Sequence, residues 1–349
     1  MRVVVVGASG NVGTALLRRL RADPTVTSLV GLVRRPPHGP VPPPYDTAQW
    51  HGVDIGAPGP DDPVVDRLRG LVAGADAVVH LAWAIQPSHD RDLQRRTHVD
   101  GTRRVLEAAV RAGVPHLVVA SSVGAYAPSY SDQPRDEDWE VGGIRSSWYS
   151  NDKVAVERLL DEAEVRHPGL AVARLRPALV FQRGAGSQIK RYFLGPLVPA
   201  RLLDGHLPTL PWPAGMRLQA VHADDLADAY REAVVRQAQG PFNIAGPGLV
   251  RAPDVADVLS AGRWREVPHA LVRAALGAAW HARVAPVGPG WFDMGASVPV
   301  LGTGRAEREL GFRPRYTGVQ ALRDLLDGLV RGAGTASPPM RPRRERPSR

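Results

Sequence analysis

Tyr149 and Lys153 are the residues whose types and spacing most directly suggest chemistry. Only two of the 44 basic residues are lysines, and one of them stands four positions after this tyrosine. At the start of a helix, positions i and i+4 share a face, which would bring the ammonium near the phenol oxygen. A nearby cation favours phenolate and lowers a phenol pKa that begins at about 10. The pair predicts a proton-transfer site, and an exposed helical pair without a function is the alternative.

A glycine-rich turn near the N-terminus predicts a dinucleotide site. The run Gly7-Ala8-Ser9-Gly10-Asn11-Val12-Gly13 follows a four-valine strand and opens an amphipathic helix. In that position glycines let the backbone approach a pyrophosphate, whose charge is stabilised by free N–H groups of the helix. The expected cofactor-binding residues are Gly7, Ser9, Gly10, Asn11, Val12 and Gly13. A tight turn without a ligand is the alternative.

The end of the second expected strand bears on the choice of cofactor. A carboxylate about 20 residues beyond the last glycine would bind the ribose 2′-hydroxyl of NAD. The chain has Arg34 and Arg35 there instead. Guanidinium groups suit a 2′-phosphate, with which they make charge-assisted bidentate contacts. We therefore expect NADP(H), with NAD as the other possibility, and Arg34 as the better candidate of the two.

The elements that must position these residues alternate between strands and helices, which is typical of a parallel sheet built from βαβ units. Continuous apolar runs predict buried strands at Val3–Val6, Leu29–Val33, Ala77–Leu81, His116–Ser121 and Ala171–Arg176. Apolar spacing near 3.6 predicts helices over Asn11–Ala22 and Arg95–Ala112, and another after Tyr149. We expect an α/β protein with a doubly wound, Rossmann-type parallel sheet.

The second half has a different pattern, because prolines and tryptophans interrupt the alternation of strands and helices after about residue 182. We expect a dinucleotide-binding domain over residues 1–182 and a smaller substrate domain over 183–330. Within the latter, residues 217–245 should return to the main sheet, and the last helix should cover about 319–330. Residues 331–349 are rich in Pro, Gly, Ser and Arg, so we expect a disordered basic tail.

Composition narrows the functional classes. There are no cysteines, which excludes disulfides, thiolate metal ligands and a cysteine nucleophile. The histidines show no metal-ligand spacing, so no metal site is expected. The tail carries five of the nine net positive charges, which argues against nucleic acid as a partner of the folded body. No apolar run approaches a membrane span, and Val3–Val6 is too short for a secretory signal, so we expect a cytoplasmic protein.

Taken together, the chain resembles an extended short-chain dehydrogenase/reductase, a group that includes nucleotide-sugar epimerases and many ketoreductases. Further segments match that group in order: Asp54-Ile55, His80-Leu81-Ala82, Ala120 to Tyr126, Arg176 to Val180 and Leu310 to Pro314. The resemblance implies that Ser122 joins Tyr149 and Lys153 as a catalytic residue. It also implies cofactor contacts from Asp54, Ile55, Leu81, Ala82, His98, Tyr149, Lys153, Pro177 and Val180, and it implies a homodimer.

The resemblance implies a mechanism for a small-molecule substrate. NADPH would deliver hydride to a carbonyl carbon while Tyr149 exchanges the proton of its oxygen. Lys153 would lower the pKa of Tyr149 and hold the nicotinamide ribose, and Ser122 would hydrogen-bond the substrate oxygen.

The chain also departs from the group's pattern. His98 stands where the group usually has asparagine, and either a substitute hydrogen bond or simple packing would explain it. Gln182 replaces an expected glycine, and Val123-Gly124 replace the carboxylates that sugar dehydration requires. Reduction, oxidation and epimerisation remain open, so a nucleotide-sugar epimerase with tightly bound NAD is one alternative. A cofactor-binding sensor or scaffold without turnover is another, and nucleic-acid binding through the tail is a third.

Overall fold

Parallel strands form the central sheet, which has seven strands in the order β10-β6-β5-β4-β1-β2-β3. The computed structural model describes residues 1–37, 39–195 and 203–342. The register pairs Val3 with Leu29 on one side and with Ala77 on the other. The chain reverses its direction of travel across the sheet between β1 and β4, which is where doubly wound folds bind ligands. The strands of this sheet are β1 (Arg2–Val6), β2 (Ser28–Val33), β3 (Ala48–Gly52), β4 (Ala77–His80), β5 (His116–Ala120), β6 (Ala171–Pro177) and β10 (Gly240–Ile244).

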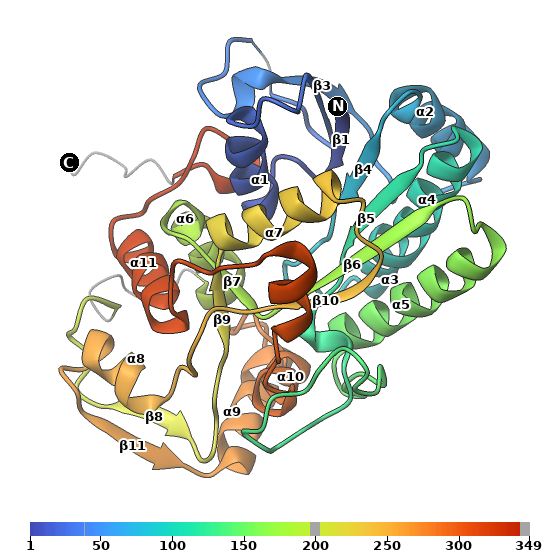
Figure 1. The fold of residues 1–349 in the computed structure, drawn as a ribbon. Helices are drawn as coiled ribbons and strands as arrows, with labels where there is room; N and C mark the ends of the chain where they lie inside the picture. The colour runs from blue at the N-terminus through green and yellow to red at the C-terminus, as the bar shows by residue number, and fades with distance from the viewer. Residues whose placement is uncertain (38, 196–202, 343–349) are drawn as a thin grey trace.

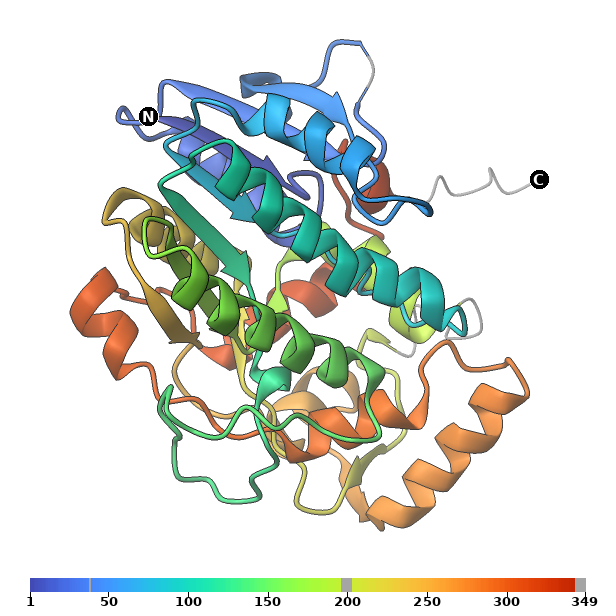
Figure 2. The same cartoon turned by 90° about the vertical axis from the view of Figure 1, so that its right-hand side faces the viewer.

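Helices cover both faces of the sheet. On one face α1 (Asn11–Arg21) packs against α7 (Ala223–Val235), and the two lie side by side in Figure 1. On the other face lie α2 (Asp62–Val72), α4 (Gly101–Arg111) and α5 (Trp148–Arg166), and Figure 2 shows α4 beside α5. Apolar side chains fill both interfaces, so the strands are buried on both faces.

The remaining elements lie mostly beyond the carboxyl ends of the strands, in the lower part of Figure 1. Short parallel pairs join β7 with β9 and β8 with β11. The bounds are β7 (Leu179–Phe181), β8 (Leu210–Pro213), β9 (Ala220–His222), β11 (Trp264–Val267), α3 (Arg91–Arg95), α6 (Gly186–Ile189), α8 (Ala252–Leu259), α9 (His269–His281), α10 (Pro289–Ser297) and α11 (Gly318–Val330). The division into two domains at residue 182 stays a prediction.

The strands expected in the first half and the helix expected over Asn11–Ala22 are present within one residue of the expected bounds, and the Rossmann-type fold is confirmed. The helix expected over Arg95–Ala112 starts differently, because α3 ends at Arg95, a π-helical turn covers Arg96–Asp100 and α4 begins at Gly101. The edge strand β3 was missed because its sequence, Ala-Gln-Trp-His-Gly, has no apolar run: its side chains are half-buried or exposed. Within the part of the chain that the structure describes, no helix has the length and apolar character needed to cross a bilayer.

The expectation of disorder from residue 331 onward is wrong for residues 331–342. Met340 is fully buried among side chains of α11 and its neighbours. Ser337 donates a 2.5 Å hydrogen bond to the Ser9 carbonyl, and Thr335 accepts one of 2.7 Å from Tyr45. Composition suggested a solvated tail, but a buried methionine and these polar contacts anchor the segment to the outside of the glycine-rich turn. Residues 343–349 lie outside the described residues.

Candidate active site

Most of the predicted site residues lie at one edge of the sheet, because they follow the carboxyl ends of parallel strands. The glycine-rich turn follows β1, Arg34 and Arg35 follow β2, and Asp54 and Ile55 follow β3. The others are Leu81 and Ala82 after β4, Ser122 after β5, Pro177 and Val180 at the end of β6 and in β7, His98 just before α4, and Tyr149 and Lys153 in the first two turns of α5.

The backbone of the glycine-rich turn fits a pyrophosphate. Gly7 has φ +90°, and a Cβ there would meet the Ala82 backbone at 2.6 Å. A Cβ on Gly13 would collide with Ala8 at 2.6 Å, so this glycine lets α1 pack against the turn. Gly10 is different, because a Cβ there would approach only the Gly7 carbonyl, at 3.5 Å. The open side of Gly10, at the N-terminus of α1, is where a phosphate can approach the backbone.

Gln182, one of the departures from the group's pattern, holds the turn to the segment after β6. Its amide donates to both the backbone and side-chain oxygens of Asn11, at 2.9 and 2.6 Å. Asn11 in turn donates to the Val180 carbonyl at 3.3 Å. These bonds connect the glycine-rich turn to the segment that follows β6, next to Pro177.

The residues expected at the adenosine end differ in burial. Arg34 and Arg35 are exposed where β2 ends, and Asp54 is exposed where β3 ends. Ile55 is buried and packs against Gly101, where a Cβ would come within 2.8 Å of the isoleucine side chain. Two guanidinium groups at this end are therefore available to a 2′-phosphate.

Ser122 and Tyr149 are brought together at the other end. Ser122 lies close enough to Tyr149 to lower the pKa of its phenol, and Ser122 Oγ accepts a hydrogen bond from the Gly124 N–H at 3.0 Å. A Cβ on Gly124 would lie 2.9 Å from the Met294 sulfur and 3.1 Å from the Tyr149 ring, so a larger residue there would press on both side chains. The first turn of α5 is fixed by Ser150, which donates to the Gly124 carbonyl at 2.5 Å.

Lys153 lies one turn further along α5 and is buried. Its ammonium donates to the Ala120 carbonyl at 2.7 Å and lies 3.3 Å from the centroid of the Trp83 ring. An ammonium has three protons. One is donated to Ala120 and a second can point at the Trp83 ring, so the third remains for a cofactor hydroxyl. Burial lowers the pKa of Lys153 to about 7, and the charges of Glu157 and Asp152 oppose that shift.

The pKa of Tyr149 differs from the expectation that a cation lowers it. Burial raises this pKa to about 12, although the bond to Ser122 opposes the shift. The reason is the direction of the ammonium, which faces Ala120 and Trp83. Tyr149 is therefore a protonated phenol at neutral pH, the form that donates a proton to a substrate oxygen.

Lys153→Met should stabilise the protein at pH 6 by on the order of 3 kcal/mol, and the gain should shrink as pH rises to 10. The folded-state pKa of about 7 lies below the unfolded value of about 10.4, so the cost of burying the charge is full below pH 7 and fades between the two. Urea unfolding of both proteins at pH 6 and pH 10 measures it, with Lys190→Met as the control. An equal difference at the two pH values would contradict the prediction.

A buried ion cluster connects α5 to the neighbouring strands β5 and β6. Glu157 accepts hydrogen bonds from Arg176 at 2.8 Å through both Nε and Nη2, and from Arg174 at 3.1 Å. It also accepts from Ser121, which precedes Ser122. Arg176 also donates to the Tyr126 hydroxyl at 2.8 Å. The cluster ties α5 to β5 and β6, and so fixes the distance between the Ser122 and Tyr149 backbones.

His98 both hydrogen-bonds and packs, and its contact with the cofactor stays a prediction. Its Nδ1 is 2.7 Å from the buried Asp152 carboxylate, which Arg91 also binds. Its ring stacks on Trp83 at 4.0 Å. Its Nε2 lies 3.2 Å from the Ala84 carbonyl, so both ring nitrogens face acceptors. Burial lowers the pKa of His98, and the bonds to Asp152 and Ala84 oppose that shift. The chain Arg91–Asp152–His98–Trp83 leads directly to Lys153.

A pocket of about 190 Å³ opens beside Tyr149, between α5 and the segment that contains α9 and α10. We call it the tryptophan pocket. The described residues that line it are Ser88, Gln94, His98, Ser146, Ser147, Trp148, Tyr149, Trp280, His281, Gly288, Pro289, Gly290 and Trp291.

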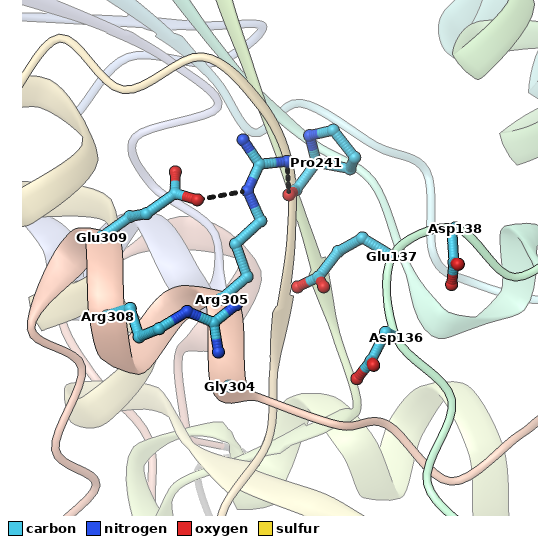
Figure 3. Close-up of a pocket in the computed structure, with 8 residues that line it drawn as sticks. All are labelled: Asp136, Glu137, Asp138, Pro241, Gly304, Arg305, Arg308 and Glu309. Atoms are coloured by element: carbon cyan, nitrogen blue, oxygen red, sulfur yellow. Dashed lines mark hydrogen bonds and ion pairs between the residues drawn. The ribbon is translucent and has the colours of Figure 1, made fainter.

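A larger hollow of about 440 Å³ lies elsewhere, between the loop that carries Glu137 and the helical segment that carries Arg305. Figure 3 shows Arg305 engaged by Glu309 and by the Pro241 carbonyl, both at 2.9 Å. None of Ser122, Tyr149 and Lys153 lines it. Among the described residues, no three His, Asp or Glu side chains gather closely enough to hold a metal ion.

Sequence reasoning missed Trp83, Asp152 and Glu157. One signal was available for Glu157, because positions 149, 153 and 157 are spaced by four and share a helix face. Nothing local marked Trp83, whose contacts come from other elements.

Comparisons with known proteins agree with this geometry. The family model described as "NAD dependent epimerase/dehydratase family" matches residues 3–245. An uncharacterised Mycobacterium tuberculosis protein is 28% identical over 264 residues, which cover 74% of this chain but only 23% of that one. The chain thus spans about a quarter of that relative's length.

Two solved structures share the fold. The Thermus thermophilus UDP-glucose 4-epimerase complex with NAD has TM-score 0.68 and 21% identity, with 95% of this chain and 100% of that one covered. The terminal R domain of the myxalamid PKS-NRPS pathway has TM-score 0.70 and 20% identity, with 95% and 90% covered.

Proposed function

The chain belongs to the NAD-dependent epimerase/dehydratase family, and we propose that within it this protein is an NADP(H)-dependent oxidoreductase acting on a carbonyl or secondary alcohol. The observation that carries the proposal is the grouping of Ser122, Tyr149 and Lys153 at one end of the sheet edge, with Tyr149 lining a pocket and Lys153 one helical turn away.

Each residue has a distinct task. The cofactor supplies or accepts the hydride when bound. Ser122 hydrogen-bonds the substrate oxygen and keeps it close to Tyr149, whose protonated phenol donates to that oxygen as negative charge develops there. Lys153 offers its free proton to a cofactor hydroxyl. The buried cluster of Glu157 with Ser121, Arg174 and Arg176, which we call the Glu157 cluster, holds α5 at a fixed distance from the end of β5.

The proposal distinguishes reduction from epimerisation by the fate of the cofactor. Incubating the enzyme with NADPH and a ketone should consume NADPH in proportion to product. No consumption with any carbonyl compound tried, together with NAD retained at full occupancy after purification, would favour the second candidate. That candidate is a nucleotide-sugar epimerase, and the fold shared with a UDP-glucose 4-epimerase supports it.

Arg34→Ala should weaken NADPH binding by about 10- to 100-fold and leave NADH binding unchanged. The lost charge-assisted bond to a 2′-phosphate is worth roughly 1.5–3 kcal/mol, and NADH has no such phosphate. Titration of both cofactors by calorimetry measures this, with the exposed Arg265→Ala on β11 as the control. Equal weakening of both cofactors, or tighter binding of NADH by the wild type, would remove the NADP assignment.

A homodimer, which the resemblance to the short-chain dehydrogenase/reductase group implies, and a cytoplasmic location, which the sequence features described first suggest, complete the proposal. Sedimentation of the purified chain tests the dimer.

A further inference from the structure

The tryptophan pocket has a composition that bears on the substrate. Building on the proposed function, we infer that it binds an uncharged ketone or secondary alcohol carrying a ring, and that it excludes nucleotide sugars. The argument rests on three properties of the pocket: its aromatic walls, its charges and its volume.

Indole rings form two of the walls. Trp291 lies 4.9 Å from the Tyr149 ring at 41°, and Phe193 meets its other side at 5.3 Å, edge to face. Trp280 is stacked on His89 at 3.7 Å and packs against Gly288, where a Cβ would come within 3.2 Å of the indole. Because both indoles are held by neighbours, they present fixed flat surfaces. Such surfaces favour a ring stacked directly beside the proposed proton donor.

The charges argue against an anion. Among the described residues that line the pocket there is no Asp, Glu, Lys or Arg; its histidines are His98, whose pKa is lowered by burial, and His281. Two arginines close by are already bound: Arg91 packs over Trp148 but is paired with Asp152, and Arg273 on α9 is paired with Asp293 at 2.8 Å. Arg145 precedes the lining residue Ser146, but it is exposed and does not line the pocket. A diphosphate enclosed by the lining residues would lose its hydration without meeting a lysine or an arginine among them, which is costly.

Two helices begin at the pocket, α5 at Trp148 and α10 at Pro289, so the positive ends of both helix dipoles face this space. The α5 end is partly satisfied, because Ser147 caps it by accepting from the Ser150 N–H. Positive helix ends attract neutral and negative oxygens alike, so they can stabilise the substrate carbonyl or hydroxyl, and the selection of an uncharged ligand comes from the lining residues and the volume.

The volume agrees with one ring. The pocket holds about 190 Å³, below the roughly 300–1,000 Å³ of pockets that enclose drug-sized ligands. A nucleotide sugar has a base, two sugars and a diphosphate, whereas acetophenone has one ring and one carbonyl.

Matched ligands test the inference with the full chain saturated with NADP⁺. Calorimetry should show acetophenone binding at least 10-fold tighter than 4-acetylbenzoate, which differs only by its carboxylate. UDP-glucose should not bind at millimolar concentration. Equal or tighter binding of 4-acetylbenzoate or UDP-glucose would overturn the inference.

Two variants locate the binding. Trp291→Ala should weaken acetophenone binding about 10-fold, whereas Trp264→Ala, exposed on β11, should not. Because Trp291→Ala removes packing, a second variant adds charge at an exposed residue of the pocket lining: Ser146→Arg should shift the ratio of the two affinities about 10-fold toward 4-acetylbenzoate. No effect of either variant would place the ligand elsewhere and overturn the inference.

Binding and turnover separate this inference from the proposed function. If acetophenone binds as described but NADPH is never consumed, the pocket assignment stands and the oxidoreductase proposal fails. If NADPH is consumed but UDP-sugars are the preferred ligands, the oxidoreductase proposal stands and the pocket assignment fails.

Discussion

Tyr149→Phe should lower kcat for NADPH-dependent ketone reduction by about 10³-fold, the contribution of a positioned general acid. The phenol is protonated at neutral pH because burial raises its pKa to about 12, and Ser122 lies next to it. Phenylalanine keeps the ring that packs against Trp83 and Trp291 but removes the proton. NADPH affinity should stay within a few-fold of the wild type, because the glycine-rich turn is untouched. Stopped-flow absorbance at the NADPH band measures the chemical step.

The matched control for this change is Tyr130→Phe. Tyr130 is 79% exposed, so the loss of its hydroxyl should leave kcat unchanged. A Tyr149→Phe enzyme that retains more than a tenth of wild-type kcat would show that another group donates the proton.

Glu157→Gln should lower the free energy of unfolding at pH 7 by about 3–5 kcal/mol, because removing one partner of a buried ion cluster leaves uncompensated charge. The carboxylate is 1% exposed and bound by Arg174 and Arg176, both 4% exposed. The amide is nearly isosteric, so packing is preserved and the loss is electrostatic. Kinetics should worsen as well, since Ser121 and α5 lose their common partner. Urea unfolding at pH 7 measures the change.

The pH dependence adds a second test of the Glu157 cluster. Burial raises the pKa of Glu157, but the bonds and charges of Arg176, Ser121 and Arg174 outweigh it and bring the pKa to about 2. The stabilisation is therefore full above the unfolded pKa of about 4.3 and is lost as pH falls toward 2. The difference in free energy of unfolding between the wild type and Glu157→Gln should therefore become smaller as the pH falls over that range.

Glu162→Gln on the same helix is the control for Glu157→Gln. Glu162 is 67% exposed and pairs with Arg166 at the surface, where an ion pair is worth at most about 1 kcal/mol. Equal losses from the two variants would mean that the Glu157 cluster does not stabilise the fold.

The local sequence determined the sheet and the turns at its edge. Buried parallel strands need continuous apolar runs, and a pyrophosphate turn needs glycines, so Val3–Val6 and the motif from Gly7 to Gly13 could be read directly. The spacing of Tyr149 and Lys153 likewise follows from helix geometry. The edge strand β3 was not predicted, because a strand with half-buried and exposed side chains has no such apolar run.

Only the tertiary structure decided the electrostatics of the candidate site. The pKa of Tyr149 depends on burial and on the direction of the Lys153 ammonium, which is set by Trp83 and Ala120. The tryptophan pocket joins Trp291 to Tyr149 across 142 positions of sequence, and Met340 anchors a segment that its composition marks as solvated. Such properties arise from groups distant in the chain, so residue types and local spacing carry no signal for them.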